Sequence, residues 1–313
     1  MSRQPEYVWM GGDYIRWQDA KVHVASECAM RGANVFEGIR GYLDAPGTRL
    51  MFFRLPDHLD RFFNSMKLMR MQPPYARATY VEAIAGCTAQ NGFAEDVYVR
   101  LTTYFGLGKN YGYLPDEVEI DSAVIVSPRG RPEGLPQGIH CMTSTWLRIS
   151  DRAMPPRIKA GANYQNSRLA FVEARINGYD GALLLNADGR VAEGPGACLF
   201  IVRAGTLITP PVTAGILESI TRATVLELAT RELGIPTAIR DVDRTEVYLA
   251  DEAFFCGTAQ EITPIISLDR YAVGSGEPGA ITRSVQQFFF QIVRGERPAY
   301  SHWLTPVPAK VAV

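Results

Sequence analysis

The amino-acid sequence predicts a mixed α/β fold divided into two domains. Its 313 residues suggest about two domains, and 47% of them are hydrophobic against 21% charged, as in a well-packed globular protein. Candidate strands and helices occur in clusters, which favours a mixed α/β or α+β architecture over regular βαβ alternation. A stretch with two prolines and two glycines in eight residues, 127–134, separates two such clusters. We therefore expect a small α/β domain at residues 1–127, an interdomain loop at 128–134 and a larger domain at 135–313.

The first domain should combine short strands with two helices. Pro56 stands where a helix would begin, and apolar residues follow it at helical spacing: Leu59, Phe62, Phe63, Met66 and Met69. A second helix is predicted from the capping-box sequence at residues 79–82 to the stop signal Asn91-Gly92. Strands are predicted where β-branched and apolar residues gather, at residues 22–24, 51–54, 97–103 and 122–126.

The second domain should contain a hairpin and three helices. Residues 182–185 and 191–193 flank an Asp188-Gly189 turn, which is a strong hairpin signal, and strands follow at 198–202 and 207–209. Three helices are predicted. The first contains Leu169, Val172 and Ile176 and ends at Asn177-Gly178, the second runs from about 220 to 233, and the third covers about 281–292. Their apolar residues fall on one face of each helix: Leu169, Val172 and Ile176; Val225, Leu228 and Ala229; and Ile281, Val285, Phe288, Phe289 and Ile292.

The composition excludes several classes of function. Lys and Arg together number 32 against 33 Asp and Glu, so the chain lacks the basic excess that broad nucleic-acid binding requires. No apolar run approaches the roughly 18 residues of a membrane span, and the polar N-terminus predicts no export signal. The five cysteines and four histidines are scattered, which disfavours a disulfide framework, a zinc site or another metal cluster. We therefore expect a cytoplasmic protein with reduced thiols.

Lys159 is the first candidate for chemistry. Lysine is scarce in this chain, and Lys159 is followed by Ala160-Gly161-Ala162-Asn163-Tyr164, small residues that would let a cofactor approach the backbone. A lysine desolvated there would have a depressed pKa and could form a Schiff base. The alternative from composition alone is a surface lysine in a loop.

Three other segments carry weaker signals. Glu193 ends a hairpin strand and is either a solvated turn carboxylate or a fixed negative charge that keeps a ring nitrogen protonated. The helix that opens with Ile220-Thr221-Arg222 is either an ordinary capped helix or a phosphate site made by its free amides and the Thr221 hydroxyl. The turn Gly257-Thr258-Ala259 offers further amides and a hydroxyl.

Taken together, these segments resemble the class IV (fold type IV) pyridoxal-phosphate aminotransferases, and especially the branched-chain amino acid aminotransferases. The resemblance rests on residues 35–40 (Val-Phe-Glu-Gly-Ile-Arg), residues 159–164, Glu193-Gly194, residues 220–222 and residues 257–259. It extends from about Trp9 to Gly295, with the motifs in the family's order and spacing. It implies the two-domain fold of D-amino acid aminotransferase-like enzymes, with pyridoxal 5'-phosphate between the domains.

The resemblance also implies a cofactor site. Lys159 matches the catalytic lysine that forms the Schiff base and moves the proton between Cα and C4′, and Tyr164 matches the tyrosine bonded to the phenolic oxygen. Glu193 matches the carboxylate beneath the pyridine nitrogen, where a held proton makes the ring an electron sink. Arg61 matches the phosphate-binding arginine, although it could also be a solvated arginine. The remaining cofactor positions are Leu217, Ser219, Ile220, Thr221, Gly257 and Thr258.

A substrate pocket is implied as well. Its lining would consist of Phe36, Gly38, Arg40, Tyr98, Arg100, Thr258 and Ala259. The segment 98–100 and the turn at Thr258-Ala259 would hold the α-carboxylate. Phe36 could instead be an ordinary core residue, and Arg100 a paired structural charge.

Four departures from the branched-chain pattern bear on the substrate. Arg31 stands where relatives usually carry an aromatic residue, and the linker 128–131 lacks the aromatics that normally wall the aliphatic pocket. Ser219 replaces a common glycine and Cys198 a common asparagine, and both replacements are small. Because an arginine pairs bidentately with a carboxylate, Arg31 and the loop arginines Arg129 and Arg131 suggest a substrate with a second polar group.

The activity that the resemblance implies is transfer of an amino group from an L-amino acid, branched-chain above all, to 2-oxoglutarate by a ping-pong mechanism. A homodimer or higher oligomer is implied too, with small-molecule amino acids and 2-oxo acids as partners. Two alternatives remain open. One is an enzyme of the same fold with another specificity: a polar or specialised amino acid, a D-amino acid or (R)-amine transaminase, or an aminodeoxychorismate lyase. The other is a cofactor-free binding protein.

Overall fold

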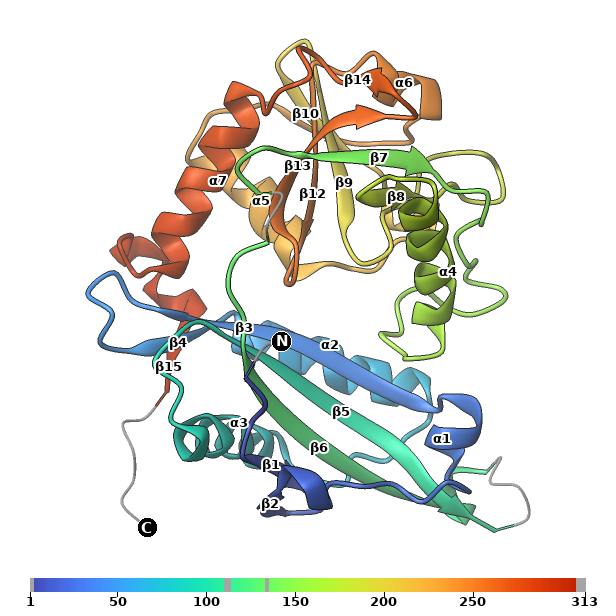
Figure 1. Cartoon of the computed structure of the whole chain (residues 1–313), viewed down its shortest axis with the longest axis vertical. Coiled ribbons are helices and arrows are strands. Elements are labelled where there is room, and N and C mark those ends of the chain that lie inside the picture. The colour runs from blue at the N-terminus through green and yellow to red at the C-terminus, as the bar shows by residue number, and fades with distance from the viewer. Residues whose placement is uncertain (1–2, 110–113, 133–134, 308–313) are drawn as a thin grey trace. The chain divides into compact units, whose positions relative to one another are not determined.

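A computed structural model describes residues 3–109, 114–132 and 135–307, and its chain divides into two compact units (Figure 1). Unit 1 takes the N-terminal segment to Gly130, the short segment Ile158–Ala162, and the C-terminal segment from Gln291. Unit 2 takes Arg131–Arg157 and Asn163–Phe290. Both later segments of unit 1 fall within residues 135–313, the range predicted for the second domain, because their partners lie far away along the chain.

Unit 1 is built on an antiparallel sheet with strand order β15-β4-β3-β5-β6-β1-β2 among the described residues. The strands are β1 (Tyr7–Met10), β2 (Asp13–Arg16), β3 (Asn34–Leu43), β4 (Leu50–Phe53), β5 (Val97–Gly108), β6 (Val118–Pro128) and β15 (Leu304–Pro306). The helices are α1 (Glu27–Arg31), α2 (Leu55–Leu68) and α3 (Arg77–Asn91), with short 3-10 turns at Trp17–Asp19, Pro115–Glu117 and Pro298–Trp303.

Helices α2 and α3 lie along one face of this sheet, and the apolar core fills the space between (Figure 1). Alternate residues of each strand point into that core, as the twofold period of a strand requires. On β3 these are Val35 and Ile39, and on β5 they are Val97, Val99 and Leu101, all of them fully buried. The residues between them belong to the opposite face, and that face carries the candidate site.

Unit 2 is built on a mixed sheet with strand order β11-β10-β9-β12-β13-β7-β8, and β14 pairs with β13. The strands are β7 (Ile139–Thr143), β8 (Gly181–Leu183), β9 (Cys198–Arg203), β10 (Thr206–Thr209), β11 (Thr237–Ile239), β12 (Glu252–Gly257), β13 (Glu261–Leu268) and β14 (Tyr271–Ala272). The helices are α4 (Asn163–Ile176), α5 (Ile220–Arg231), α6 (Arg244–Tyr248) and α7 (Ala280–Val293), with a 3-10 turn at Val212–Ala214. The part of α7 from Gln291 onward belongs to unit 1. Pairs β7–β8, β7–β13 and β10–β11 are parallel.

The mixed α/β fold class is confirmed, as are the elements with strong local signals. Helix α2 begins with Pro56 in its first turn, and α3 ends at Gly92 in a left-handed conformation. Strands β4, β5, β6, β9 and β10 and helices α4, α5 and α7 form where they were predicted. Backbone bonds between Leu184 and both Ala192 and Glu193 confirm the hairpin.

Other local predictions are wrong. Residues 22–24 form no strand, and the side chains of Val22 and Val24 are exposed. Helix α3 begins at Arg77, so the capping box predicted at 79–82 lies inside the helix and not at its start. Strands β1, β2 and β3 were not predicted; β3 contains Gly38 and Gly41, which weaken a strand signal.

The apolar face predicted for α4 does not point into the core. Leu169, Val172 and Ile176 are exposed, and the helix buries small and polar residues such as Ala170 and Ala174 instead. The fold therefore leaves an apolar stripe of α4 on the surface of unit 2. In the described part of the chain, no helix is both long enough and apolar enough to cross a membrane.

Candidate active site

The pairing of β3 with β5 brings the predicted substrate residues of unit 1 onto one face of its sheet. Gly38 lies opposite Arg100 and Arg40 lies opposite Tyr98, and side chains two residues apart on a strand share a face. The phenol of Tyr98 lies directly over Gly38, since a Cβ added there would be 1.9 Å from the Tyr98 Oη. Glycine at position 38 is therefore what lets the Tyr98 ring cross the strand.

Cations surround the two aromatic rings on this face. The Arg100 guanidinium lies 4.1 Å from the centre of the Phe36 ring and 5.9 Å from the centre of the Tyr98 ring. The Lys159 Nζ lies 4.9 Å from the same Phe36 ring centre. The Phe36 ring thus lies close to both an amine and a guanidinium. Since Phe36 is only 6% exposed, it is at once a buried residue of its strand and a part of the candidate site.

The backbone on both sides of Lys159 is fixed to β3 and α2. The Lys159 carbonyl accepts a hydrogen bond from Phe36 N at 2.9 Å, and Lys159 N donates to Ser65 Oγ at 3.2 Å. Its neighbours Ile158 and Ala160 are buried in the core of unit 1. Because the anchors are backbone atoms and neighbouring residues, the half-buried side chain of Lys159 is not needed to hold the loop.

Arg61, predicted to bind phosphate, lies on α2 and pairs with Glu37. Arg61 Nε and Nη2 donate to the two Glu37 oxygens at 2.7 and 2.8 Å, and His58 Nδ1 lies 2.7 Å from Glu37 Oε2. Burial opposes the charge on Glu37, but Arg61 and His58 outweigh it and hold the pKa of Glu37 well below its ordinary value. Burial lowers the pKa of His58, so its neutral ring donates from Nδ1 to the carboxylate.

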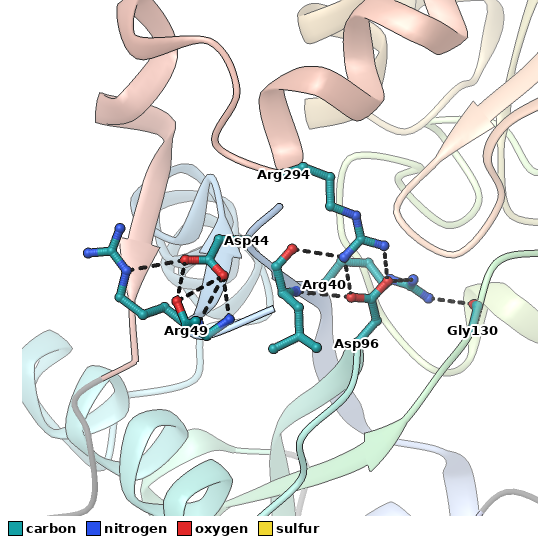
Figure 2. A network of polar contacts seen from close by, with 8 residues as sticks. Arg40, Asp44, Arg49, Asp96, Gly130 and Arg294 are labelled. Atoms are coloured by element: carbon teal, nitrogen blue, oxygen red, sulfur yellow. Dashed lines mark hydrogen bonds and ion pairs between the residues drawn. The ribbon is translucent and has the colours of Figure 1, made fainter. Parts of the chain in front are cut away.

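Arg40 is fully buried and joins a polar network at the end of the sheet (Figure 2). Its Nη1 donates to the Gly130 carbonyl at 3.0 Å, and its guanidinium lies 3.9 Å from Asp96. Arg294 binds both oxygens of Asp96, at 2.6 and 2.7 Å. Arg40 therefore anchors the chain at Gly130, a structural task that the predicted substrate role did not include.

Arg31, the last residue of α1, forms an ion pair with Glu27 one helical turn earlier. Glu27 is 7% exposed, so the pair keeps a nearly buried carboxylate neutralised. The positive charge at Arg31 thus has a partner within its own helix.

In unit 2, Glu193 is a buried carboxylate with a dedicated cation. Arg148 Nη2 lies 2.7 Å from Glu193 Oε1, and both side chains are about one-twentieth exposed, at 5% and 6%. Leu217 N lies 3.3 Å from each Glu193 oxygen, and Arg148 Nε donates to the Gly215 carbonyl at 3.1 Å. Glu193 is therefore not a solvated turn carboxylate.

The start of α5 follows shortly after Leu217, whose amide faces that carboxylate. Ser219 is the N-cap, and its hydroxyl accepts from Arg222 N at 3.2 Å, so this serine caps the helix. Ile220 and Thr221 occupy the first turn, and Thr221 is 4% exposed. The amides of a helix's first turn have no partner within the helix, which makes this end attractive to an anion.

The other predicted residues of unit 2 lie at the ends of its elements. Gly257 ends β12, with Thr258 and Ala259 half-buried after it; a Cβ at Gly257 would be 3.1 Å from the Gly196 carbonyl. Tyr164 is half-buried in the first turn of α4.

Sequence reasoning missed three polar residues of these clusters. Glu37 lies within the motif at residues 35–40, and the twofold period of β3 would have placed it on the helix-covered face. His58 lies three residues before Arg61 on the predicted helix. Arg148 lies in no motif, and only the folded chain brings it to Glu193.

Comparisons with known proteins point to one family, and the curated relatives match nearly the whole chain. A family model described as class IV amino-transferase matches residues 34–268. The branched-chain-amino-acid aminotransferase of Salmonella typhimurium (strain LT2) is 38% identical over 312 residues, covering 98% of this chain and 99% of that protein. The probable branched-chain-amino-acid aminotransferase of Aquifex aeolicus is 35% identical over 304 residues, covering 96% and 97%.

Solved structures give the same result. The branched-chain amino acid aminotransferase of Thermobaculum terrenum, in its PLP form, is 43% identical with a TM-score of 0.92, covering 97% of this chain and 99% of that one. The branched-chain aminotransferase of the thermophilic archaeon Thermoproteus uzoniensis, solved with norvaline, is 40% identical with a TM-score of 0.91, covering 97% of this chain and 100% of that one.

Proposed function

Because the chain belongs to the class IV aminotransferase family, we propose that it moves the amino group of L-amino acids to 2-oxoglutarate with pyridoxal 5'-phosphate as cofactor. The donors are branched-chain amino acids: leucine, isoleucine and valine. The relatives named as branched-chain aminotransferases, at 35–38% identity over almost their full length, support this substrate class. The observation that carries the proposal is the anchored Lys159, whose amine lies beside Phe36.

The residues present fit the cofactor by the chemistry of their donors. Lys159 offers an amine for its aldehyde, Tyr164 a phenol for its ring hydroxyl, and Glu193 a carboxylate for its ring nitrogen. The first turn of α5 offers amides and the Thr221 hydroxyl for its phosphate. When bound, pyridoxal phosphate supplies an aldehyde that condenses with amines and a ring that accepts electrons.

With the cofactor bound, Lys159 would act as the acid and base of the reaction. Its Nζ would move the proton between the substrate Cα and the cofactor. The backbone bonds to Ser65 and from Phe36 fix the backbone that carries this amine. Proton transfer over a short distance is efficient when a single base, already in position, both removes and returns the proton.

Glu193 would hold a proton on the ring nitrogen of the bound cofactor. Arg148 and the Leu217 amide keep the carboxylate ionised and oriented in a nearly buried setting. An ionised carboxylate favours the protonated form of a facing base. Arg100, Tyr98 and the turn at Thr258-Ala259 bind the substrate's α-carboxylate in this proposal.

We place the enzyme in the cytoplasm as a homodimer or higher oligomer. All five cysteines are free thiols, as is usual in a reducing compartment. The exposed apolar stripe of α4, with Leu169, Val172 and Ile176, supports association with a second copy.

The proposal is tested by Lys159→Ala. Because the loop is held by backbone anchors, the variant should fold normally but transaminate at least about a thousandfold more slowly. Activity is measured with leucine and 2-oxoglutarate, and borohydride reduction followed by mass spectrometry shows whether cofactor is fixed to Lys159.

Lys67→Ala is the matched control, since Lys67 is an exposed lysine on α2. It should retain both activity and the fixed adduct. A panel of L- and D-amino donors with 2-oxoglutarate and pyruvate separates the proposed activity from its relatives. Transfer only from D-donors, or pyruvate release from aminodeoxychorismate without an acceptor, would contradict the proposal.

A further inference from the structure

Glu37 is a fully buried carboxylate on β3 that the proposed reaction does not use. Its two oxygens accept from Arg61 Nε and Nη2 at 2.7 and 2.8 Å, the two-point geometry that suits a carboxylate and a guanidinium. Taking such a pair out of water costs about as much as the attraction returns, so the pair adds little to stability. The two-point contact does provide orientation, because it fixes the plane of the Arg61 guanidinium.

His58 in turn fixes the carboxylate of Glu37. It lies on α2 three residues before Arg61, is 1% exposed, and places its Nδ1 2.7 Å from Glu37 Oε2. Because burial lowers the pKa of His58, its neutral ring donates this hydrogen bond. Glu37 therefore accepts from two residues on one face of α2, and a rotation of its carboxylate would break all three contacts.

The same helix and strand also hold Lys159. Lys159 N donates at 3.2 Å to Ser65 Oγ, and Ser65 follows Arg61 by four residues, or about one turn of α2. The Lys159 carbonyl accepts at 2.9 Å from the amide of Phe36, the neighbour of Glu37 on β3. The backbone of Lys159 and the guanidinium of Arg61 are thus positioned by the same two elements of unit 1.

This shared support matters for a cofactor with two reactive ends. Pyridoxal 5'-phosphate carries its aldehyde and its phosphate arm on adjacent carbons of one ring, so a protein that binds both needs an amine and a cation at a set separation. An arginine that is ordered only when the phosphate binds loses side-chain entropy at that moment, which weakens binding. Arg61, already held by Glu37, avoids that loss.

We propose that Glu37 and His58 are positioning residues, which hold the Arg61 guanidinium in the orientation that binds the cofactor's phosphate. This inference rests on the proposed function and on the phosphate role that the resemblance assigns to Arg61. If the pair only neutralised a buried charge, Glu37 would compete with the phosphate for the same guanidinium. Removing the negative charge of Glu37 would then strengthen phosphate binding, whereas the positioning role predicts that it weakens it.

The test compares the binding of pyridoxal 5'-phosphate with that of pyridoxal, which lacks the phosphate. The full-length chain, freed of cofactor, is titrated with each compound and followed by absorbance. Glu37→Gln should weaken the binding of pyridoxal 5'-phosphate about tenfold, the effect of one lost charge-assisted contact, and change that of pyridoxal less than about twofold. Asp44→Asn is the control, since Asp44 is a nearly buried carboxylate paired with Arg49, and it should leave the ratio of the two dissociation constants unchanged.

Two variants at His58 supply a second test. His58→Leu removes the donor to Glu37 and should lower the preference for pyridoxal 5'-phosphate over pyridoxal about threefold. His58→Asn keeps an N–H donor near the place of Nδ1 and should restore the wild-type preference. General damage to the fold would weaken the binding of both compounds, so the ratio separates positioning from a structural effect.

The outcomes distinguish this inference from the proposed function. An unchanged or higher preference in Glu37→Gln, or equal preferences in His58→Leu and His58→Asn, would overturn the inference and leave the proposed function in place. If wild type binds pyridoxal 5'-phosphate but transfers no amino group from leucine, the proposed function fails, and the ratios still decide the role of Glu37. If wild type binds the two compounds equally, Arg61 does not bind the phosphate and the inference is wrong.

Discussion

Glu193 and Glu37 are carboxylates that the fold removes from water, and each is neutralised by an arginine. Glu193 is 4% exposed and Glu37 is fully buried. An isolated buried carboxylate would cost several kcal/mol, so Arg148 and Arg61 are needed for these residues to stay charged. A charge kept in this way is available to chemistry without waiting for solvent to rearrange.

Replacing Arg148 tests this argument at one residue. Arg148→Met should lower the free energy of unfolding by about 3 kcal/mol, because it leaves Glu193 buried without its cation. Urea denaturation followed by circular dichroism measures the loss. Arg152→Met, at an exposed arginine, is the control and should change stability by less than about 0.5 kcal/mol.

The double variant Arg148→Met/Glu193→Gln completes the cycle. It should recover part of the lost stability, since the amide carries no charge that needs the arginine. Additive losses in the double variant would mean that Arg148 acts through packing and its bond to the Gly215 carbonyl alone.

At the scale of elements, β3 carries two different surfaces on its alternating residues. Glu37 points to α2, where Arg61 and His58 meet it, and Gly38 lies under the Tyr98 ring on the other face. A single strand thus positions both the arginine predicted for the phosphate and the ring between Arg100 and Arg129.

Gly38→Ala should disturb only the second of these surfaces. The new Cβ would overlap Tyr98 Oη, and the half-buried ring can swing away, so the main loss is in substrate positioning. We expect kcat/KM for 2-oxoglutarate to fall about tenfold to a hundredfold. Gly130→Ala is the control, since its Cβ would meet no atom within 4 Å. Unchanged kinetics for Gly38→Ala would show that the Tyr98 ring does not position substrate.

Local sequence signals predicted those helices and strands that form because of residues close together in the sequence. Pro56 with its apolar spacing gave α2, and the β-branched runs gave β5 and β6. Strand β3 was missed because its glycines are explained only by the neighbouring Tyr98 side chain. The outward apolar face of α4 could not be foreseen either, since periodicity finds a face but not what covers it.

Among the residues of the candidate site, too, some carry a local sequence signal and others do not. Lys159 and Glu193 could be predicted from motifs in the family's spacing, and the family itself is confirmed by the comparisons. Their partners were not predictable, because Ser65, Phe36 and Arg148 are distant in sequence and nothing local marks them as partners. The ion pair of Arg31 with Glu27 could have been found from their four-residue spacing in a helix.

At the scale of the whole molecule, the end of the chain completes the sheet of unit 1. Strand β15 pairs with β4, and the Trp303 ring centre lies 6.0 Å from that of Phe53. Arg294 donates to the Leu43 carbonyl at 2.8 Å and binds Asp96. Residues from Gln291 onward are thus part of the same unit as the first strands, and β4 would be an edge strand without them.

Arg294→Gln should loosen this closing segment. The lost two-point contact with Asp96, whose side chain is 12% exposed, should weaken the attachment by about 2 kcal/mol. Amide hydrogen exchange read by mass spectrometry should then become faster in peptides covering β15 and β4, because their pairing opens more often. Arg283→Gln, at an exposed arginine of α7, is the control and should leave exchange in both strands unchanged. If β15 exchanges at the wild-type rate in Arg294→Gln, then the strand pairing and Trp303 hold the C-terminal segment without help from the Asp96 pair.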